Sequence, residues 1–287
     1  MAIETTDIPE AEPSPRLRLS FELWLGLGLL AVIILGSALS PWIAPYDPQE
    51  IDFTRKLLPP SFAHPFGTDS LGRDVFSRVL AAGQTSVLIG FATVLAAVII
   101  GLPIGLMAGY FGGRLDSILM RTSEIFLAFP PLLLPILIVA VLGPGLLNAM
   151  VAVAISWFPW YARIMRGATI AIREELYVKA ARAMGVSDVA ILFRHILPNA
   201  SSPLLAQGSL DFGYAILAAA ALGFLGLGAR PPSLEWGMMI AENRSLILDY
   251  WWTAVFTGLA IAIGVIAANL IGDGARDALD PHNLTER

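Results

Sequence analysis

The sequence predicts an all-α, polytopic membrane protein with six transmembrane helices. Of the 287 residues, 56% are hydrophobic and only 14% are charged, against about 25% charged in an ordinary soluble domain. The mean hydropathy is +0.71. Several charge-free stretches also reach the roughly 20 residues that a helix needs to cross a bilayer. This composition excludes a soluble domain, a disordered chain and a coiled coil.

Apolar stretches, free of charge except for Asp211 in 204–228, define the expected spans in chain order. The long stretch 125–162 is interrupted by Gly143-Pro144-Gly145, a strong turn signal, and is therefore divided in two. The expected spans are 23–43, 79–113, 125–142, 146–162, 204–228 and 251–271.

The first span differs from a cleaved signal peptide. The residues before it are acidic, and its apolar run is longer than the usual 7–15 residues of a signal peptide. These acidic residues are Glu4, Asp7, Glu10 and Glu12. We therefore expect a retained transmembrane helix.

Lysine and arginine in the connections predict the orientation, because cytoplasmic loops carry an excess of both. Placing both termini in the cytoplasm puts most of the 18 basic residues on the inner side. The net charge of −5 gives no sign of nucleic-acid binding. The predicted organisation is a cytoplasmic tail (1–20), a first transmembrane helix (21–43), an extracytoplasmic loop (44–83), a five-helix core (84–275) that includes a cytoplasmic loop (163–203), and a cytoplasmic tail (276–287).

The loop 163–203 predicts two short helices joined at Gly185, which suits the left-handed residue that often ends a helix. Ser187 or Asp188 can cap the second helix, and Pro198 and Pro203 end it. An apolar face is expected from Val189, Leu192, Phe193 and Ile196. Two interpretations stay open, an amphipathic hairpin on the inner leaflet and a docking surface for a partner.

The segment 177–185, followed by Leu197-Pro198, resembles the EAA loop of ABC-importer permeases. The positions in register with that motif are Ala180, Ala181, Gly185, Leu197 and Pro198. Two positions depart from it: Lys179 stands where the motif has glutamate, and His195 stands where it has isoleucine. The resemblance implies that these residues, Lys179 included, form a loop that couples to an ATPase.

Further motifs are similar to the C-type permeases of the dipeptide/oligopeptide family, over about residues 20–282. They are Phe66–Arg78, Ala108–Gly113, Phe224–Gly228 before Pro231-Pro232, and Gly272–Pro281. The resemblance implies the fold of an ABC type I importer permease in the bacterial plasma membrane, surrounded by lipid. It also implies a homologous second permease, two cytoplasmic ABC ATPase subunits and an extracytoplasmic substrate-binding protein. Its expected substrates are di- or oligopeptides. Nickel, glutathione and opine permeases share these motifs, so a small-solute importer of the same family stays open.

The chain itself is not expected to bind nucleotide or to catalyse a reaction. A P-loop needs a lysine that follows glycine, whereas Lys56 and Lys179, the two lysines, follow Arg55 and Val178. ATP and magnesium are therefore expected on the partner ATPases, with no cofactor here. Cysteine is absent, and the three histidines lie in separate segments, which predicts no metal site.

A secondary transporter is the alternative class, because such proteins carry ionisable groups inside the membrane. Asp211 is the clear mid-span candidate. It either lines a translocation path or is a helix-end charge that pairs with an arginine or reaches the lipid headgroups. The glycine clusters Gly26/Gly28 and Gly223/Gly226/Gly228 predict close helix packing.

The outer motif contains two acid–base pairs at a spacing of four residues. Asp69 with Arg73 and Asp74 with Arg78 would form i,i+4 pairs on a solvated helix. The other interpretation is a surface that receives the binding protein.

Overall fold

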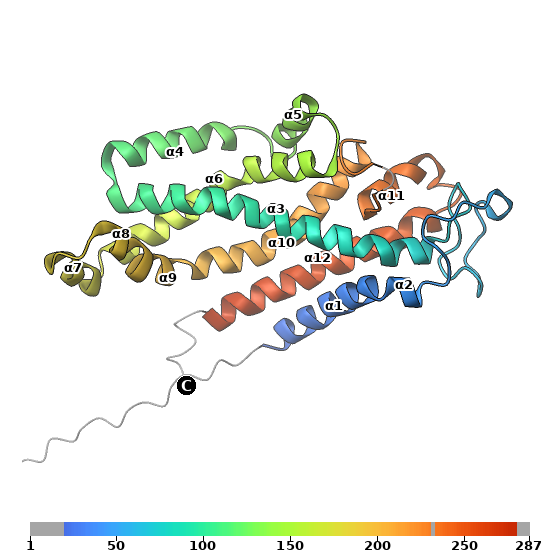
Figure 1. Ribbon diagram of the computed structural model, residues 1–287, viewed down its shortest axis with the longest axis horizontal. Coiled ribbons are helices and arrows are strands. Elements are labelled where there is room, and N and C mark those ends of the chain that lie inside the picture. Colours follow the sequence, from blue (N-terminus) through green and yellow to red (C-terminus); the bar gives the residue numbers. More distant parts are fainter. Residues whose placement is uncertain (1–19, 231–232, 280–287) are drawn as a thin grey trace, which may run out of the picture.

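The computed structural model describes residues 20–230 and 233–279, and the regular secondary structure within these ranges is helical (Figure 1). Apart from one isolated bridge between Thr68 and Asp74, the described residues contain no strand. The predicted all-α class is therefore confirmed. The expected cytoplasmic tails fall largely on 1–19 and 280–287, and the Pro231-Pro232 motif on 231–232; these lie outside the described residues.

Among the described residues, four long helices have the length and apolar composition to cross a membrane. The helices in chain order are α1 (Phe21–Ala38), α2 (Ser40–Ile43), α3 (Val75–Phe111), α4 (Gly113–Leu127), α5 (Leu133–Leu142), α6 (Leu146–Arg173), α7 (Leu176–Ala183), α8 (Asp188–Ala190), α9 (Leu197–Ala200), α10 (Ser202–Phe224), α11 (Trp236–Asn243) and α12 (Trp252–Leu279). Short helical turns are η1 (Phe53–Arg55), the π-helical η2 (Ile191–Ile196) and η3 (Arg244–Leu246). The four candidate spans are α1, α3, α10 and residues Trp252–Ala275 of α12.

The expected span 125–142 is divided between two helices. Helix α4 ends at Leu127, and the chain turns through Pro130-Pro131 before α5 begins at Leu133. Proline lacks the backbone N–H that would continue a helix, which explains the break. Helix α6 continues to Arg173, ten residues into the loop expected from Arg163. The number of six spans therefore stays a prediction.

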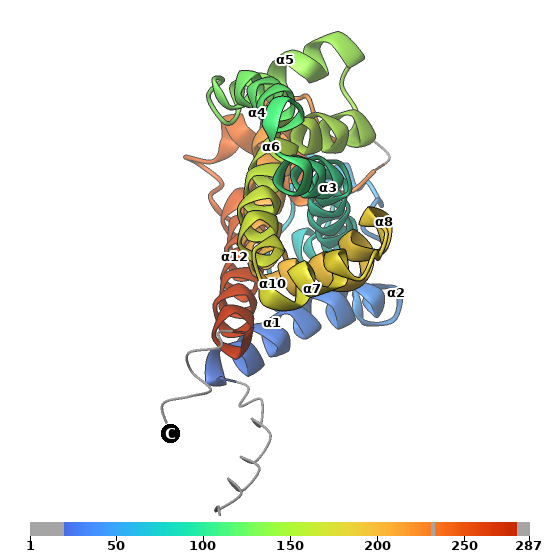
Figure 2. The ribbon, with the colours of Figure 1, turned by 90° about the vertical axis from the view of Figure 1, so that its left-hand side faces the viewer.

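The long helices lie side by side along the long axis of the molecule (Figure 1). Helix α3 packs against α6, and α10 packs between α3 and α12. Helix α1 covers α12 and α3 on one side, while α4 and α5 lie on the other (Figure 2). Helices α7 and α8 gather at one end, and the loop after α2 lies with α11 at the opposite end.

A stripe of glycines lets α3 approach α6 closely. Gly101, Gly105 and Gly109 recur every four residues, and a Cβ on each would collide with atoms of α6, including the carbonyl oxygens of Phe158 and Ala162. Small residues at this spacing are typical of tight helix pairs in membranes. The stripe explains why these two helices form the most extensive contact in the bundle.

The glycine clusters expected to pack helices do so in part. A Cβ on Gly26 would lie 2.8 Å from the Ala267 carbonyl oxygen of α12, and one on Gly223 would lie 3.2 Å from the Met238 nitrogen of α11. The prediction is wrong for Gly28, whose Cβ would meet open space, and for Gly226, which has φ +77° in the turn after α10.

Candidate functional site

The short helix α7 ends at Gly185 in a Schellman motif. Gly185 has φ +80°, the left-handed conformation that the sequence predicts. The Gly185 N–H donates to the Arg182 carbonyl over 3.0 Å, and the Val186 N–H donates to the Ala181 carbonyl over 3.1 Å. These two bonds are those of the motif, and they redirect the chain after one short helix.

The segment after Gly185 is capped by Ser187, whose hydroxyl accepts from the Ala190 N–H over 3.4 Å. The predicted continuous apolar face is wrong. Leu192 and Ile196 are buried, whereas Val189 and Phe193 are 65% and 59% exposed. The reason is the π-helical turn η2, which has more residues per turn than an α-helix. The apolar residues therefore divide between an inner and an outer face.

The inner face fixes this segment to the helix bundle. Val178 and Ala181 of α7 are buried in one hydrophobic cluster with Ile191 and Ile196 of η2 and with Tyr110 at the end of α3. An apolar seam of this kind gives the 174–200 segment a single packed position on the bundle.

Polar contacts at Tyr110 strengthen this attachment. The Tyr110 hydroxyl donates a hydrogen bond to Asp188. The Arg182 guanidinium lies 5.1 Å from the centre of the Tyr110 ring, a cation–π distance. The Arg173 Nη1 donates to the Gly109 carbonyl over 2.7 Å. Helices α3 and α6 and the segment after them are thus joined at one end of the molecule.

The outer face of the same segment exposes large apolar side chains. Soluble surfaces rarely gather such residues unless they bind something. We call this set the coupling surface: Leu176, Tyr177, Met184, Val189 and Phe193, which are 83%, 44%, 77%, 65% and 59% exposed.

The motif residues of the EAA-like loop divide between the two faces. Ala181 is buried and Leu197 is half-buried, while Lys179, Ala180, Gly185 and Pro198 are exposed. Lys179 Nζ lies 3.1 Å from Glu174 Oε2. The hydrogen bond from Lys179 lowers the pKa of the Glu174 carboxyl, so this ion pair forms on the solvated side.

Asp211 lies in the middle of α10 and makes two hydrogen bonds. The Tyr161 hydroxyl of α6 donates to Asp211 Oδ2 over 2.6 Å, and Gln207 Nε2 donates to Oδ1 over 2.9 Å. Among the described residues Asp211 forms no ion pair. Its pairing with an arginine, which the sequence left open, is therefore absent from this part of the chain.

A pocket of about 440 Å³ opens beside this carboxylate. We call it the Asp211 pocket. It lies between the turn after α4, the middle of α6 and the inner half of α10. Its polar groups are Asp211, Gln207 and Ser156, and its remaining wall is aromatic or aliphatic. The aromatic side chains are Phe126, Phe129, Trp157 and Trp160.

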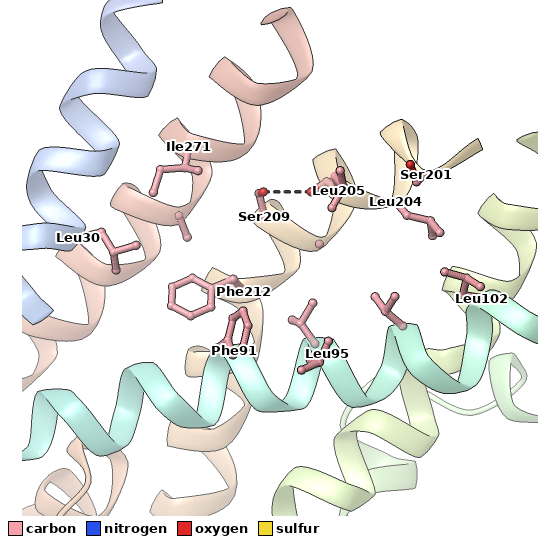
Figure 3. Close-up of a pocket in the computed structure, with 14 residues that line it drawn as sticks. Leu30, Phe91, Leu95, Leu102, Ser201, Leu204, Leu205, Ser209, Phe212 and Ile271 are labelled. Carbon is pink, nitrogen blue, oxygen red and sulfur yellow. Dashed lines mark hydrogen bonds between the residues drawn. The ribbon is translucent and has the colours of Figure 1, made fainter. Parts of the chain in front are cut away.

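A second pocket, of about 380 Å³, lies on another face of α10, between α1, α3 and α12 (Figure 3). Its wall is apolar apart from Ser201 and Ser209, and the Ser209 hydroxyl donates to its own helix at the Leu205 carbonyl. Phe91 and Phe212 point toward each other across it (Figure 3). This pocket offers a polar solute almost no partner, whereas the Asp211 pocket offers a carboxylate.

The outer motif forms a buried ionic network. The predicted Asp69–Arg73 pair is present, with Arg73 Nε 2.7 Å from Asp69 Oδ2. Arg78 Nη1 lies 3.4 Å from the same oxygen, and both arginines donate to Glu242 Oε2, over 2.7 and 2.8 Å. Asp69 and Arg78 are each 1% exposed. These charges therefore do not lie on a solvated helix, as the i,i+4 interpretation expected.

The predicted Asp74–Arg78 pair is wrong. Asp74 instead caps α3, accepting from the Ser77 N–H over 2.8 Å, and its other oxygen lies 2.9 Å from His64 Nδ1. The reason is that α3 begins at Val75, so Asp74 occupies the N-cap position and turns toward the helix end. Glu242, the acid that Arg78 contacts, lies 164 residues away, beyond the reach of any spacing rule.

The start of α11 is fixed against α3 by further buried polar groups. Glu235 caps the helix by accepting from the Gly237 and Met238 N–H groups. Burial raises the pKa of Glu235 despite these bonds. The Trp236 indole donates to the Val79 carbonyl over 3.0 Å. Among the described residues no group of three or more His, Asp or Glu side chains could hold a metal ion.

Comparison with known proteins agrees with this architecture. Residues 101–284 match the family described as "Binding-protein-dependent transport system inner membrane component". The chain belongs to this family. Residues 23–60 match a second family, the "N-terminal TM domain of oligopeptide transport permease C". The protein is thus an inner membrane permease subunit of an ABC importer.

Named relatives extend over most of the chain. One, from Escherichia coli K12, is 49% identical over 88% of this chain and 85% of its own length, and is named "Probable D,D-dipeptide transport system permease protein DdpC". Another, from Alkalihalophilus pseudofirmus OF4, is 45% identical over 90% of this chain and 84% of its own, and is named "Dipeptide transport system permease protein DppC".

A solved structure shares the fold. A chain of the MetNI methionine ABC transporter in an inward-facing conformation aligns with a TM-score of 0.59, at 20% identity, over 71% of this chain and 98% of its own. This permease therefore has the helical arrangement of a known importer subunit.

Proposed function

We propose that this permease forms half of the translocation path of an ATP-driven importer of di- or oligopeptides. A homologous second permease supplies the other half. Two cytoplasmic ABC ATPases drive the cycle, and an extracytoplasmic binding protein delivers the substrate. The chain itself is non-catalytic and holds no cofactor, because ATP and magnesium bind to the ATPases. Both termini lie in the cytoplasm of a bacterium.

The observation that carries this proposal is the coupling surface at one end of the bundle. Its apolar side chains are exposed, while the segment beneath them is fixed to α3 and α6. A partner that binds this surface can therefore move α3 and α6. The alternative of an inner-leaflet hairpin accounts for the apolar side chains but not for this rigid attachment.

The peptide substrate is supported by the names of the two relatives described above, which match most of the chain. A nickel importer of the same family is the alternative. Nickel sites favour imidazole ligands, and the described residues that line the Asp211 pocket include no histidine. A polar solute with apolar parts fits this wall better than a bare cation.

The test is uptake by the complete complex in proteoliposomes. Labelled dipeptide should accumulate only when ATP, both ATPases and the binding protein are present. Phe193→Asp places a charge on the coupling surface and should release the ATPases from the detergent-solubilised complex. Phe62→Asp, the same substitution at an exposed phenylalanine in the loop between α2 and α3, serves as the matched control. Uptake without ATP would establish the secondary-transporter alternative, and uptake of nickel but not peptide would establish the metal alternative.

A further inference from the structure

The Asp211 carboxylate has no cationic partner among the described residues. It lies on a candidate membrane span, and its described neighbours supply only neutral donors, Tyr161 and Gln207. An ionisable group inside the membrane is costly and is retained where it acts on a substrate, an ion or a proton. The two hydrogen bonds fix the direction of the carboxylate and leave lone pairs on both oxygens for a further donor.

The walls of the Asp211 pocket also suit a cation. Trp157 and Trp160 of α6 and Phe126 of α4 line the same space as the carboxylate. Aromatic faces attract ammonium groups, and tryptophan does so most strongly. Among the described residues no arginine or lysine lines the pocket, which leaves the carboxylate available to a cationic group of a substrate.

We infer that the Asp211 pocket binds the α-ammonium group of a short peptide during its passage. This inference rests on the proposed peptide-import function and names the group by which the path holds the substrate. The carboxylate accepts the ammonium hydrogens, the indoles cover its apolar neighbours, and Tyr161 and Gln207 act as positioning residues for the carboxylate. L- and D,D-dipeptides differ in stereochemistry but share this ammonium group, so such a subsite serves both.

The charge of the pocket wall determines which end of the peptide enters, because the described lining residues include an acid but no lysine or arginine. A peptide C-terminal carboxylate would be repelled by Asp211 and would find no positive partner there. The amino end therefore occupies the pocket, and the carboxyl end points away from it. The apolar pocket on the other face of α10 (Figure 3) cannot take this role because it has no charged group.

The experiment measures binding of alanyl-phenylalanine to the purified full complex without its binding protein, by saturation-transfer NMR. N-acetyl-alanyl-phenylalanine is the matched ligand, because it lacks only the ammonium group. We expect the acetylated peptide to bind at least about tenfold more weakly, the scale of one hydrogen-bonded charge. Asp211→Asn should weaken the free peptide to the same extent and remove the difference between the two ligands. Asp211→Glu should restore much of it.

Two controls separate this site from general damage. Glu22→Gln removes an exposed carboxylate at the start of α1, outside the pocket, and should leave binding unchanged. The Asp211→Asn complex should co-purify with both ATPases in the same ratio as the wild type, which shows that the complex is assembled. Equal binding of the two ligands by the wild type, or equal binding by the wild type and Asp211→Asn, would overturn the inference.

The proposed function is tested separately by ATP-driven uptake in proteoliposomes. If the wild type imports peptide but binds the free and the acetylated dipeptide equally well, the ammonium subsite alone is refuted. Absence of peptide uptake, with the ammonium-dependent binding intact, would refute the import function alone.

Discussion

Arg78 and Glu242 lie 164 residues apart in the chain, and Arg78 Nη2 donates a hydrogen bond to Glu242 Oε2 over 2.8 Å. The side chain of Arg78 is 2% exposed. Because Glu242 belongs to α11, this pair fixes that short helix to the N-terminal end of α3.

We predict that Arg78→Met strongly destabilises the protein. The change leaves the Asp69 carboxylate, which is buried, and that of Glu242 without one of their cations, and breaking a buried pair costs about 3–5 kcal/mol. The measurement is the thermal unfolding midpoint of the detergent-purified complex. Arg55→Ala is the control, because Arg55 pairs with Asp52 at the surface and is 44% exposed; its loss should cost under about 1 kcal/mol. Similar small shifts for both variants would contradict the structural role of the network.

Gly105→Ala should loosen the contact between α3 and α6. The added methyl group would collide with the Ala162 carbonyl and lie 2.7 Å from Met165 Cβ, and overpacking of this kind costs about 1–3 kcal/mol. Gly167→Ala is matched to it, because that position is also helical but open, and alanine there gains up to about 1 kcal/mol. Unfolding midpoints that move in opposite directions are the expected result; a neutral Gly105→Ala would argue against the glycine stripe.

Gly185→Val should disorder the junction between α7 and the next helical turn. A β-branched residue at φ +80° is strained by about 1–2 kcal/mol. We expect no steric collision in addition to this strain, because a Cβ at Gly185 meets open space. Hydrogen exchange of residues 176–200 should therefore speed up in Gly185→Val and change little in Gly185→Asn, because asparagine tolerates this conformation. Equal exchange in both variants would contradict the conformational explanation.

Lys179→Glu tests which way the loop faces. Lys179 and Glu174 are both more than half exposed, so their pair adds little stability, and the unfolding midpoint should stay near that of the wild type. Since Lys179 lowers the pKa of Glu174, the pair persists as pH falls through the ordinary carboxyl range and is lost only below the lowered pKa. We predict that Lys179→Glu weakens co-purification of the ATPases in low salt, whereas Lys56→Glu in the outer loop does not. Unchanged co-purification would show that Lys179 lies outside the docking area.

Cysteine labelling tests the orientation, and the native chain contains no cysteine. Phe62, in the loop after α2, and Ser187, between α7 and α8, are both exposed. These two segments lie at opposite ends of the bundle (Figure 1). An impermeant thiol reagent added to intact cells should label Phe62→Cys and leave Ser187→Cys unlabelled until the membrane is opened. The reverse pattern would invert the predicted topology.

Local patterns in the sequence were sufficient to predict the fold class and the bend at Gly185. Both depend on neighbouring residues, through long apolar runs and through a glycine that follows a short helix. The break inside 125–142 depends on Pro130-Pro131. These prolines are a local signal, but a span predicted only from the absence of charged residues does not take them into account. The outward position of Phe193 depends on a π-helical turn, which has no recognisable pattern in the residues themselves.

Long-range partners account for what sequence reasoning missed. Neither Tyr161 nor Gln207 was expected beside Asp211, although Gln207 lies one helical turn away and could have been found from i,i+4 spacing. The tyrosine comes from another helix, as does Glu242 in the outer network. The Gly101-Gly105-Gly109 spacing was visible in the chain, but its partner surface on α6 becomes evident only in the packed bundle.

Helix α3 runs without interruption from Val75 to Phe111, about 55 Å at 1.5 Å per residue. Its first turns hold Arg78, which belongs to the buried ionic network with Asp69 and Glu242. Its last turn holds Tyr110, which packs against the 174–200 segment. No loop separates these two attachments. Helix α3 is therefore one continuous element between the face that would receive the binding protein and the face that would receive the ATPase. The two faces of the membrane are thereby linked mechanically within one subunit, and a tilt imposed at either end is transmitted to the other.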